Sequence, residues 1–213
     1  MPIKMALVGC GHMGRIHLEK LSSFNEIQLA GIADVDTEQV NQLAQQHKVT
    51  AFNDYRKLLG NTDGVVIATP TETHYQIAKD FLETGAHVLI EKPITSNQGE
   101  AKELIELSKA KQLILQVGFL ERFNPAFLKA LPDIKKPLFI ESRRASEFTG
   151  RSTDIDVVLD LMIHDIDLIL SIVKDNVLDI RAQGVSFIMD KLDVASARVE
   201  FGNGCITNLT ANR

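Results

Sequence analysis

The first 120 residues alternate short apolar runs with amphipathic segments, and this alternation limits the folds that the chain can adopt. Short apolar runs predict buried strands, whereas apolar residues recurring about every 3.6 positions predict helices packed on a sheet. Alternating strands and helices predict a doubly wound parallel α/β sheet with helices on both faces. We expect strands at residues 3–8, 27–33, 49–52, 65–68, 87–90 and 113–117, and helices at 12–23, 37–47, 74–84 and 98–110.

The pattern changes after residue 120. A short helix at 122–131, broken by Pro125 and ended by Pro132, should precede a strand at 137–144 and a long, mostly buried helix at 155–174. Three strands should follow at 177–188, 194–201 and 205–210, the last two joined by Asn203-Gly204, a composition typical of a tight hairpin turn. We therefore expect one domain at 1–120 and an α+β domain at 121–213 with a largely antiparallel open sheet that is incomplete at its C-terminal end.

The composition argues against several functional classes. The chain has 213 residues and a formal net charge of −5, and it has no basic stripe of the kind that nucleic-acid binding requires. No apolar run approaches the roughly 18 residues of a membrane span, and no signal peptide is visible. Cys10 and Cys205 are expected to be reduced packing residues. We expect a cytoplasmic protein that binds neither nucleic acid nor membrane.

A glycine-rich segment follows the first predicted strand and opens the first predicted helix. Its GxGxxG spacing lets the backbone approach a pyrophosphate, whose charge the helix N-terminus attracts. Asp34 ends the second strand 20 residues after Gly14, where a carboxylate can accept hydrogen bonds from ribose hydroxyls. Asp34 could instead cap the helix near Thr37, although Asp36 could do that. The sequence predicts a dinucleotide-binding Rossmann domain with cofactor contacts from Gly9, Gly11, His12, Met13, Gly14 and Asp34.

Two further features bear on the cofactor. The Asp34 carboxylate would repel the 2′-phosphate of NADP, so NAD is favoured, although Arg15 lies near the loop and weakens that preference. Thr69 and Pro70 follow the fourth strand and could pack against the adenine ribose. His74 either contacts the cofactor or, as we favour, starts the next helix.

Glu91-Lys92-Pro93 stands directly after the fifth strand, at the sheet edge where open α/β sheets place their ligand-contacting groups. Lys92 is a candidate for handling a proton, and Pro93 stiffens the backbone beside it. The triplet could also be only a surface strand end.

A second ionisable cluster contains Asp160 and His164. On a helix they share a face, together with Asp167. A carboxylate beside an imidazole suits acid–base chemistry near neutral pH. A core histidine satisfied by a helical neighbour is the alternative. A metal site is disfavoured, because no second histidine or cysteine stands at ligand spacing.

The order of these motifs resembles the Gfo/Idh/MocA oxidoreductases. The resemblance rests on the glycine loop, Asp34, the Thr-Pro-(x)3-His segment at 69–74, the triplet at 91–93, and the Asp160/His164 pair. It implies NAD(P)-dependent oxidation of a sugar or cyclitol hydroxyl, with Lys92 and His164 handling the proton and Asp160 positioning substrate or histidine. It also implies cofactor contacts from Glu91 and Lys92, and a homodimer or homotetramer formed through the open sheet.

The segment at 118–126 bears on the class of substrate. Arg122 and Asn124 offer a fork-shaped cation and an amide, although Arg122 could equally form an interdomain salt bridge. The string Arg-Phe-Asn-Pro-Ala at 122–126 resembles the branch that oxidises the 3-hydroxyl of UDP-linked N-acetylamino sugars. An inositol or free-sugar dehydrogenase is the nearest alternative, and a non-catalytic NAD(P)-sensing regulator is the alternative from another class.

The chain departs from the family pattern in two ways. Glycines common in the family are replaced at Thr153-Asp154-Ile155-Asp156 and at Met162, which predicts a bulkier and more acidic substrate loop. Family members are also usually longer, so part of the second domain is expected to be absent.

Overall fold

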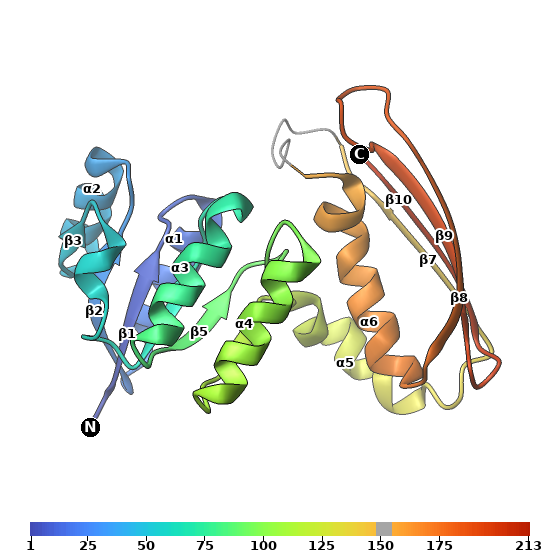
Figure 1. Cartoon of the computed structure of the whole chain (residues 1–213), viewed down its shortest axis with the longest axis horizontal. Helices are drawn as coiled ribbons and strands as arrows, with labels where there is room; N and C mark the ends of the chain where they lie inside the picture. Colours follow the sequence, from blue (N-terminus) through green and yellow to red (C-terminus); the bar gives the residue numbers. More distant parts are fainter. Residues whose placement is uncertain (148–154) are drawn as a thin grey trace. The chain divides into compact units, whose positions relative to one another are not determined.

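The computed structural model describes residues 1–147 and 155–213, so the substitutions noted at Thr153 and Asp154 lie outside the described residues. The chain forms two compact units, Met1–Gly118 and Phe119–Arg213. Each unit has its own sheet (Figure 1). Each unit also has its own buried core.

The first unit is a six-stranded parallel sheet flanked by helices, as the alternation predicted. Its strand order is β3-β2-β1-β4-β5-β6. The chain therefore runs outward from β1 and then returns to place β4 beside β1. This reversal creates a switch point at the carboxyl ends of β1 and β4, where doubly wound sheets bind ligands. The strands are β1 (Ile3–Val8), β2 (Ile27–Ala33), β3 (Ala51–Phe52), β4 (Gly64–Ile67), β5 (His87–Ile90) and β6 (Leu115–Val117).

Helices cover both faces of this sheet, which explains its continuous apolar strands. Val65 and Ile67 of β4 pack in the core on one face, and Val66 packs in the core on the other. The first core also includes Phe81, which is fully buried. The helical segments are α1 (His12–Ser23), α2 (Thr37–His47), the 3₁₀ turn η1 (Tyr55–Leu58), α3 (Thr71–Glu83) and α4 (Gln98–Ala110).

Helix α3 differs from its predicted start. It begins at Thr71 rather than His74, directly after Pro70, whose φ of −59° suits a residue entering a helix. Asp36 caps α2, because its side chain accepts a hydrogen bond from the Gln39 N–H at 3.0 Å. The alternative that Asp34 caps this helix is therefore wrong.

The second unit is a four-stranded sheet with α6 against one face (Figure 1). Its order is β7-β10-β9-β8, with β10 parallel to β7 and the other pairs antiparallel, so the largely antiparallel sheet is confirmed. Gly204 has a φ of +84° in the tight turn between β9 and β10. The elements are η2 (Leu120–Phe123), α5 (Pro125–Ala130), η3 (Leu131–Asp133), β7 (Phe139–Ala145), η4 (Val158–Met162), α6 (Ile163–Val173), β8 (Val177–Val185), β9 (Val194–Phe201) and β10 (Ile206–Asn212).

Three predictions for this unit were wrong. Pro125 starts helix α5 rather than breaking a longer helix, because Asn124 caps α5 and a proline is tolerated in the first turn. The long helix expected at 155–174 begins instead with a π-helical turn, η4, before α6. Met162, expected to enlarge a substrate loop, is 2% exposed in the core.

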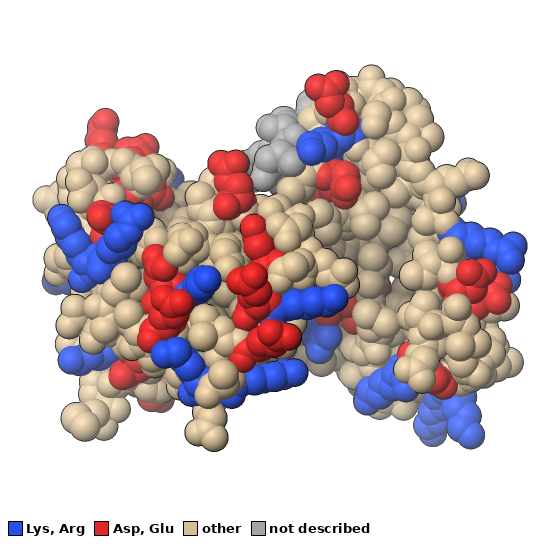
Figure 2. Space-filling view, in the orientation of Figure 1, with Lys and Arg blue, Asp and Glu red and all other residues tan. Residues whose placement is uncertain are grey.

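Charge is mixed on the face shown in Figure 2. Acidic and basic side chains interleave there over α3 and α4 of the first unit. Lys79 of α3 lies 4.0 Å from Glu103 of α4. An interleaved surface of this kind gives no one-signed field for attracting a polyanion.

Candidate functional site

The glycine loop joins β1 to α1 and contains glycines with different structural duties. Gly9 has a φ of +93°, and a Cβ there would lie 2.5 Å from the Ala68 carbonyl. A Cβ on Gly14 would lie 1.9 Å from the Gly9 oxygen. The fold therefore requires both glycines. Around Gly11, by contrast, no heavy atom of the described residues beyond its immediate chain neighbours lies within 4 Å of such a Cβ.

Gly11 is the N-cap of α1, and His12 and Met13 are the first two residues of that helix. The cap residue provides no side-chain hydrogen bond within the described chain, and the first turn carries no acidic residue. The leading N–H groups and the positive end of the helix dipole are thus suited to an anion. The open backbone at Gly11 fits the close approach of a pyrophosphate.

Asp34 is held against this loop at the end of β2. Its Oδ2 accepts a hydrogen bond from the Cys10 N–H at 2.6 Å, and its Oδ1 accepts one from the Asp36 N–H at 2.9 Å. Arg15 donates to the Gln39 Oε1 at 2.5 Å and to the Cys10 carbonyl at 3.4 Å. The loop and the carboxylate together fit the adenosine half of a dinucleotide.

Cys10 lies inside the loop but is a packing residue. Its side chain is fully buried, and Sγ lies 3.9 Å from the Ala33 carbonyl. Burial, reinforced by the Asp34 charge, raises the pKa of Cys10 to about 12. A thiol with so high a pKa is a poor nucleophile at neutral pH.

The loops after β4 and β5 meet beside His74. Thr69 and Pro70 follow β4, and β4 pairs in parallel with β5, which ends at Ile90 just before the Glu91-Lys92-Pro93 triplet. His74 is 1% exposed, and its Nδ1 lies 2.9 Å from the Pro93 oxygen. Its Nε2 lies 2.9 Å from the Thr69 oxygen. The expectation that His74 starts the helix is wrong, since its ring joins two loops instead.

The Glu91 carboxylate is held within the first unit. Its Oε1 lies 2.7 Å from Nε2 of His17, and its Oε2 accepts a hydrogen bond from the Lys92 N–H at 3.3 Å. A Cβ on Gly118 would lie 3.1 Å from the same carboxylate. The sequence reasoning missed His17. Helical spacing could have identified it, because Gly14, His17 and Leu21 lie on one face of α1, the face that packs on the sheet.

In the second unit, Asp160 lies in η4 and His164 lies near the start of α6. Asp160 Oδ2 is 3.5 Å from Nη1 of Arg213, whose side chain is only 4% exposed. Arg213 also lies 3.6 Å from Asp193. Sequence reasoning missed Arg213 because nothing in its local pattern links it to a helix more than fifty residues earlier.

Asp193 anchors the loop between β8 and β9. Its Oδ2 accepts hydrogen bonds from the backbone N–H groups of Phe187, Ile188 and Met189 at 2.7, 2.7 and 3.2 Å. The bonds from Ile188 and Phe187 are the main reason that the pKa of Asp193 is lowered.

Arg122 forms a two-pronged ion pair with Asp167, in which Nε and Nη2 each lie 2.6 Å from a carboxylate oxygen. The hydrogen bond with Asp167 raises the pKa of Arg122. Arg122 therefore does form a salt bridge, but within the second unit rather than between domains. Asn124 caps α5 and donates to Glu121 at 3.2 Å, a bond that lowers the pKa of Glu121.

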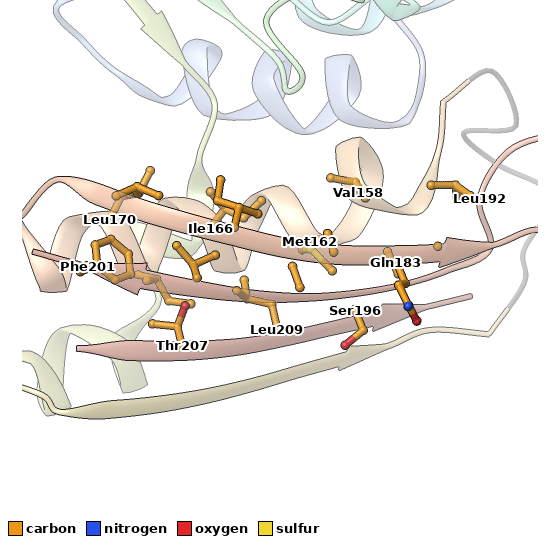
Figure 3. Close-up of a pocket in the computed structure, with 18 residues that line it drawn as sticks. Val158, Met162, Ile166, Leu170, Gln183, Leu192, Ser196, Phe201, Thr207 and Leu209 are labelled. Carbon is orange, nitrogen blue, oxygen red and sulfur yellow. The ribbon is translucent and has the colours of Figure 1, made fainter. Parts of the chain in front are cut away.

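A cavity of about 530 Å³ lies between α6 and the sheet of the second unit (Figure 3). Hydrocarbon side chains dominate its lining, with Ile166 and Leu170 from α6 facing Phe201 and Leu209 from the strands. Asp160 and His164 are not among the described residues that line it. The cavity is thus separate from the predicted acid–base pair.

Residues 3–119 match a protein-family model described as "Oxidoreductase family, NAD-binding Rossmann fold", the Gfo/Idh/MocA model. The chain is 38% identical over 213 residues to the UDP-N-acetylglucosamine 3-dehydrogenase of Acidithiobacillus ferrooxidans, covering 99% of this chain and 67% of that enzyme. It is 27% identical over 232 residues to the scyllo-inositol 2-dehydrogenase (NAD(+)) of Bacillus subtilis, covering 99% and 67%.

A solved structure of the Acidithiobacillus ferrooxidans enzyme superposes on this chain with a TM-score of 0.92. The match covers 100% of this chain and 70% of that one. Both units therefore have counterparts in a known dehydrogenase. Within the described residues, no helix has the length and apolar character that crossing a bilayer requires.

Proposed function

Because this chain belongs to the Gfo/Idh/MocA family of NAD-binding oxidoreductases, we propose that it oxidises the 3-hydroxyl of a UDP-linked N-acetylamino sugar. The observation that carries this proposal is the 38% identity to UDP-N-acetylglucosamine 3-dehydrogenase through both units, against 27% for an inositol dehydrogenase. The Arg-Phe-Asn-Pro-Ala string at 122–126 supports the same choice.

The proposed cofactor is NAD. Gly9, Gly11 and Gly14, with the N-terminus of α1, would hold the pyrophosphate, and Asp34 would accept hydrogen bonds from the adenosine ribose. The Asp34 carboxylate disfavours NADP because it would face the 2′-phosphate at close range. The hydrogen bond between Arg15 and Gln39 supports this choice, since it directs the guanidinium to a neutral partner.

The proposed chemistry assigns proton handling to Lys92 and His164. NAD supplies the hydride acceptor when it is bound. The neutral amine of Lys92 would take the hydroxyl proton as the electron pair of the C–H bond leaves as hydride, so that negative charge does not build up on oxygen. His164 would exchange that proton with solvent, and Asp160 would position the substrate or the imidazole. Lys92 and His164 belong to different units, so their joint action is part of the proposal.

Arg122 and Asn124 remain our candidate substrate contacts. Both side chains are exposed and both are locally fixed, Arg122 by Asp167 and Asn124 by its capping bond. A guanidinium held in one orientation loses little entropy when it binds a phosphate. The nucleotide diphosphate of the substrate is its proposed partner.

A substrate panel tests the proposed function. Purified protein would be incubated with NAD and, in turn, UDP-N-acetylglucosamine, its uronate, inositols and free aldoses, while NADH absorbance is followed. We expect the highest kcat/KM with a UDP-N-acetylamino sugar. A higher kcat/KM with an inositol or an aldose would overturn the substrate assignment. Tight NAD binding without turnover of any compound would instead favour a dinucleotide-sensing regulator.

We also propose that the protein assembles as a homodimer or homotetramer through the open face of the second sheet. The alternate residues of the sheet support this, because Ile140 packs in the core beneath α6, whereas Phe139 and Val185, on the opposite face, are 55% and 50% exposed. Exposed apolar area of this kind marks interaction surfaces. A monomer in sedimentation analysis at micromolar concentration would contradict the proposal.

A further inference from the structure

Lys92 is flanked by two residues that are each held by a histidine. Glu91, on one side, contacts His17 of α1, and Pro93, on the other, contacts His74 of α3. The two helices begin at different predicted cofactor loops, since α1 follows the glycine loop and α3 follows Thr69-Pro70. We call these two contacts the histidine clasps.

The first clasp is an acid–imidazole contact with little solvent around it. His17 Nε2 lies 2.7 Å from Glu91 Oε1, and the two side chains are 14% and 10% exposed. The other carboxylate oxygen accepts the Lys92 N–H. A hydrogen bond shielded from water is stronger than the same bond in solvent, so the carboxylate can fix the main chain of Lys92.

The second clasp uses both nitrogens of a buried ring. His74 lies 2.9 Å from the Pro93 oxygen through Nδ1 and 2.9 Å from the Thr69 oxygen through Nε2. One contact adjoins Lys92, and the other adjoins the predicted adenosine contacts. The ring therefore lies between the two loops, and because both partners are acceptors, each neutral tautomer donates to only one of them.

We propose that His17 and His74 are positioning residues for Lys92. The clasps hold its backbone from both sides and tie it to the loops that receive the dinucleotide, so that the amine meets the substrate hydroxyl in register with the hydride acceptor. This inference rests on the proposed role of Lys92. A displacement of about 1 Å at a reacting group can cost about 100-fold in rate, which makes such support consequential.

Asparagine and glutamine can test the two contacts separately, because the amide nitrogen of each can replace one of the two histidine nitrogens. An asparagine Nδ2 is as many bonds from Cα as histidine Nδ1, and a glutamine Nε2 is as many as histidine Nε2. His17→Gln should therefore keep its clasp, whereas His17→Asn should lose it. At the other site the order reverses, since His74→Asn keeps the Pro93 contact and His74→Gln loses it.

We expect kcat to be at least about tenfold higher for glutamine than for asparagine at position 17, and at least about tenfold higher for asparagine than for glutamine at position 74. KM for NAD should change little between the two variants at position 17. Helix propensity cannot produce this reversal, because it favours glutamine over asparagine at both positions. His47→Gln and His47→Asn, in the last turn of α2, are the matched controls and should retain wild-type kcat. The same rank order at positions 17 and 74, or wild-type kcat in all four variants, would overturn the inference.

A readout without turnover separates this inference from the proposed function. Amide exchange of residues 91–95 should be faster in His17→Asn and His74→Gln than in His17→Gln and His74→Asn. If the wild type oxidised no sugar, the proposed function would be wrong. The exchange pattern would still show whether His17 and His74 hold the backbone around Lys92. Equal exchange in all four variants would reject the clasps even in an active enzyme.

Discussion

Gly11 and Gly14 belong to one glycine motif, Gly11 as the N-cap of α1 and Gly14 inside that helix, but they face different constraints. A side chain on Gly14 would collide with the Gly9 backbone, whereas a side chain on Gly11 would enter space that the described residues leave open. The first glycine thus serves the proposed ligand, and the second serves the fold. A methyl group added to each can separate the two roles.

We expect Gly14→Ala to destabilise the protein by about 1–3 kcal/mol, because the overlap must be relieved by moving backbone. Gly11→Ala should keep the wild-type unfolding midpoint and weaken NAD binding by about tenfold, a loss of about 1.4 kcal/mol. Urea unfolding and a fluorescence titration with NAD measure the two effects. Unchanged NAD affinity in a folded Gly11→Ala variant would remove the pyrophosphate from this position.

Lys92→Met tests the proposed base without changing much volume. We expect kcat to fall by about 100-fold or more, since a general base contributes roughly that factor. NAD affinity should stay nearly unchanged, because the cofactor contacts proposed for the adenosine half lie elsewhere. Lys109→Met, in the last turn of α4, is the matched control. Wild-type kcat in Lys92→Met would show that its assigned role is wrong.

At the scale of elements, the first unit could be read closely from the sequence. Six of its elements have the predicted bounds, among them α2 and β5, because apolar periodicity and capping residues such as Asp36 and Asn97 are local signals. The start of α3 was misread because the polar residues Thr71 to Thr73 carry no apolar periodicity. The contacts of the buried His74 ring could not be predicted either, because its two partners, Thr69 and Pro93, belong to loops outside the helix.

The second unit was less predictable because its decisive contacts are long-range. The π-helical turn η4 leaves no mark in the apolar pattern, and π-helical turns are rare in proteins. Asp160 and His164 were identified from their spacing on one helix face and given roles by the family resemblance, whereas the Arg213 contact to Asp160 joins residues 53 positions apart. Sequence spacing carries no information about such a pair.

The loop before β9 should be sensitive to acid through Asp193. Its lowered pKa means that its contribution to stability is complete above the ordinary carboxyl pKa and is lost as the pH falls through the lower folded value. Asp193→Asn should therefore be less stable than wild type near pH 7, and the difference should shrink toward about pH 3. Urea unfolding followed by circular dichroism measures this. A difference that is constant with pH would contradict the prediction.

At the scale of the molecule, the two units can be followed separately. The chain has two tyrosines and no tryptophan, and both tyrosines, Tyr55 and Tyr75, lie in the first unit. Tyrosine fluorescence therefore reports that unit alone, whereas circular dichroism reports both. Because each unit has its own core, we expect each to unfold in its own transition.

NAD at about 100 times its Kd should stabilise the first unit by about 2.7 kcal/mol, because binding to the folded state shifts its equilibrium by mass action. The tyrosine-monitored midpoint should rise, while the second transition in circular dichroism should stay in place. NADP at the same concentration is the control and should have a smaller effect. A common rise of both transitions would show that the units unfold together.

Strand order in the second unit has a consequence for how the protein is made. Strand β10 lies between β7 and β9, so residues 206–212 pair with two strands that both leave the ribosome before them. Until they arrive, β7 and β9 each present an unpaired edge, which can pair with another nascent chain. Synthesis of this protein should therefore be most demanding of chaperones in the interval between the emergence of β7 and the emergence of β10.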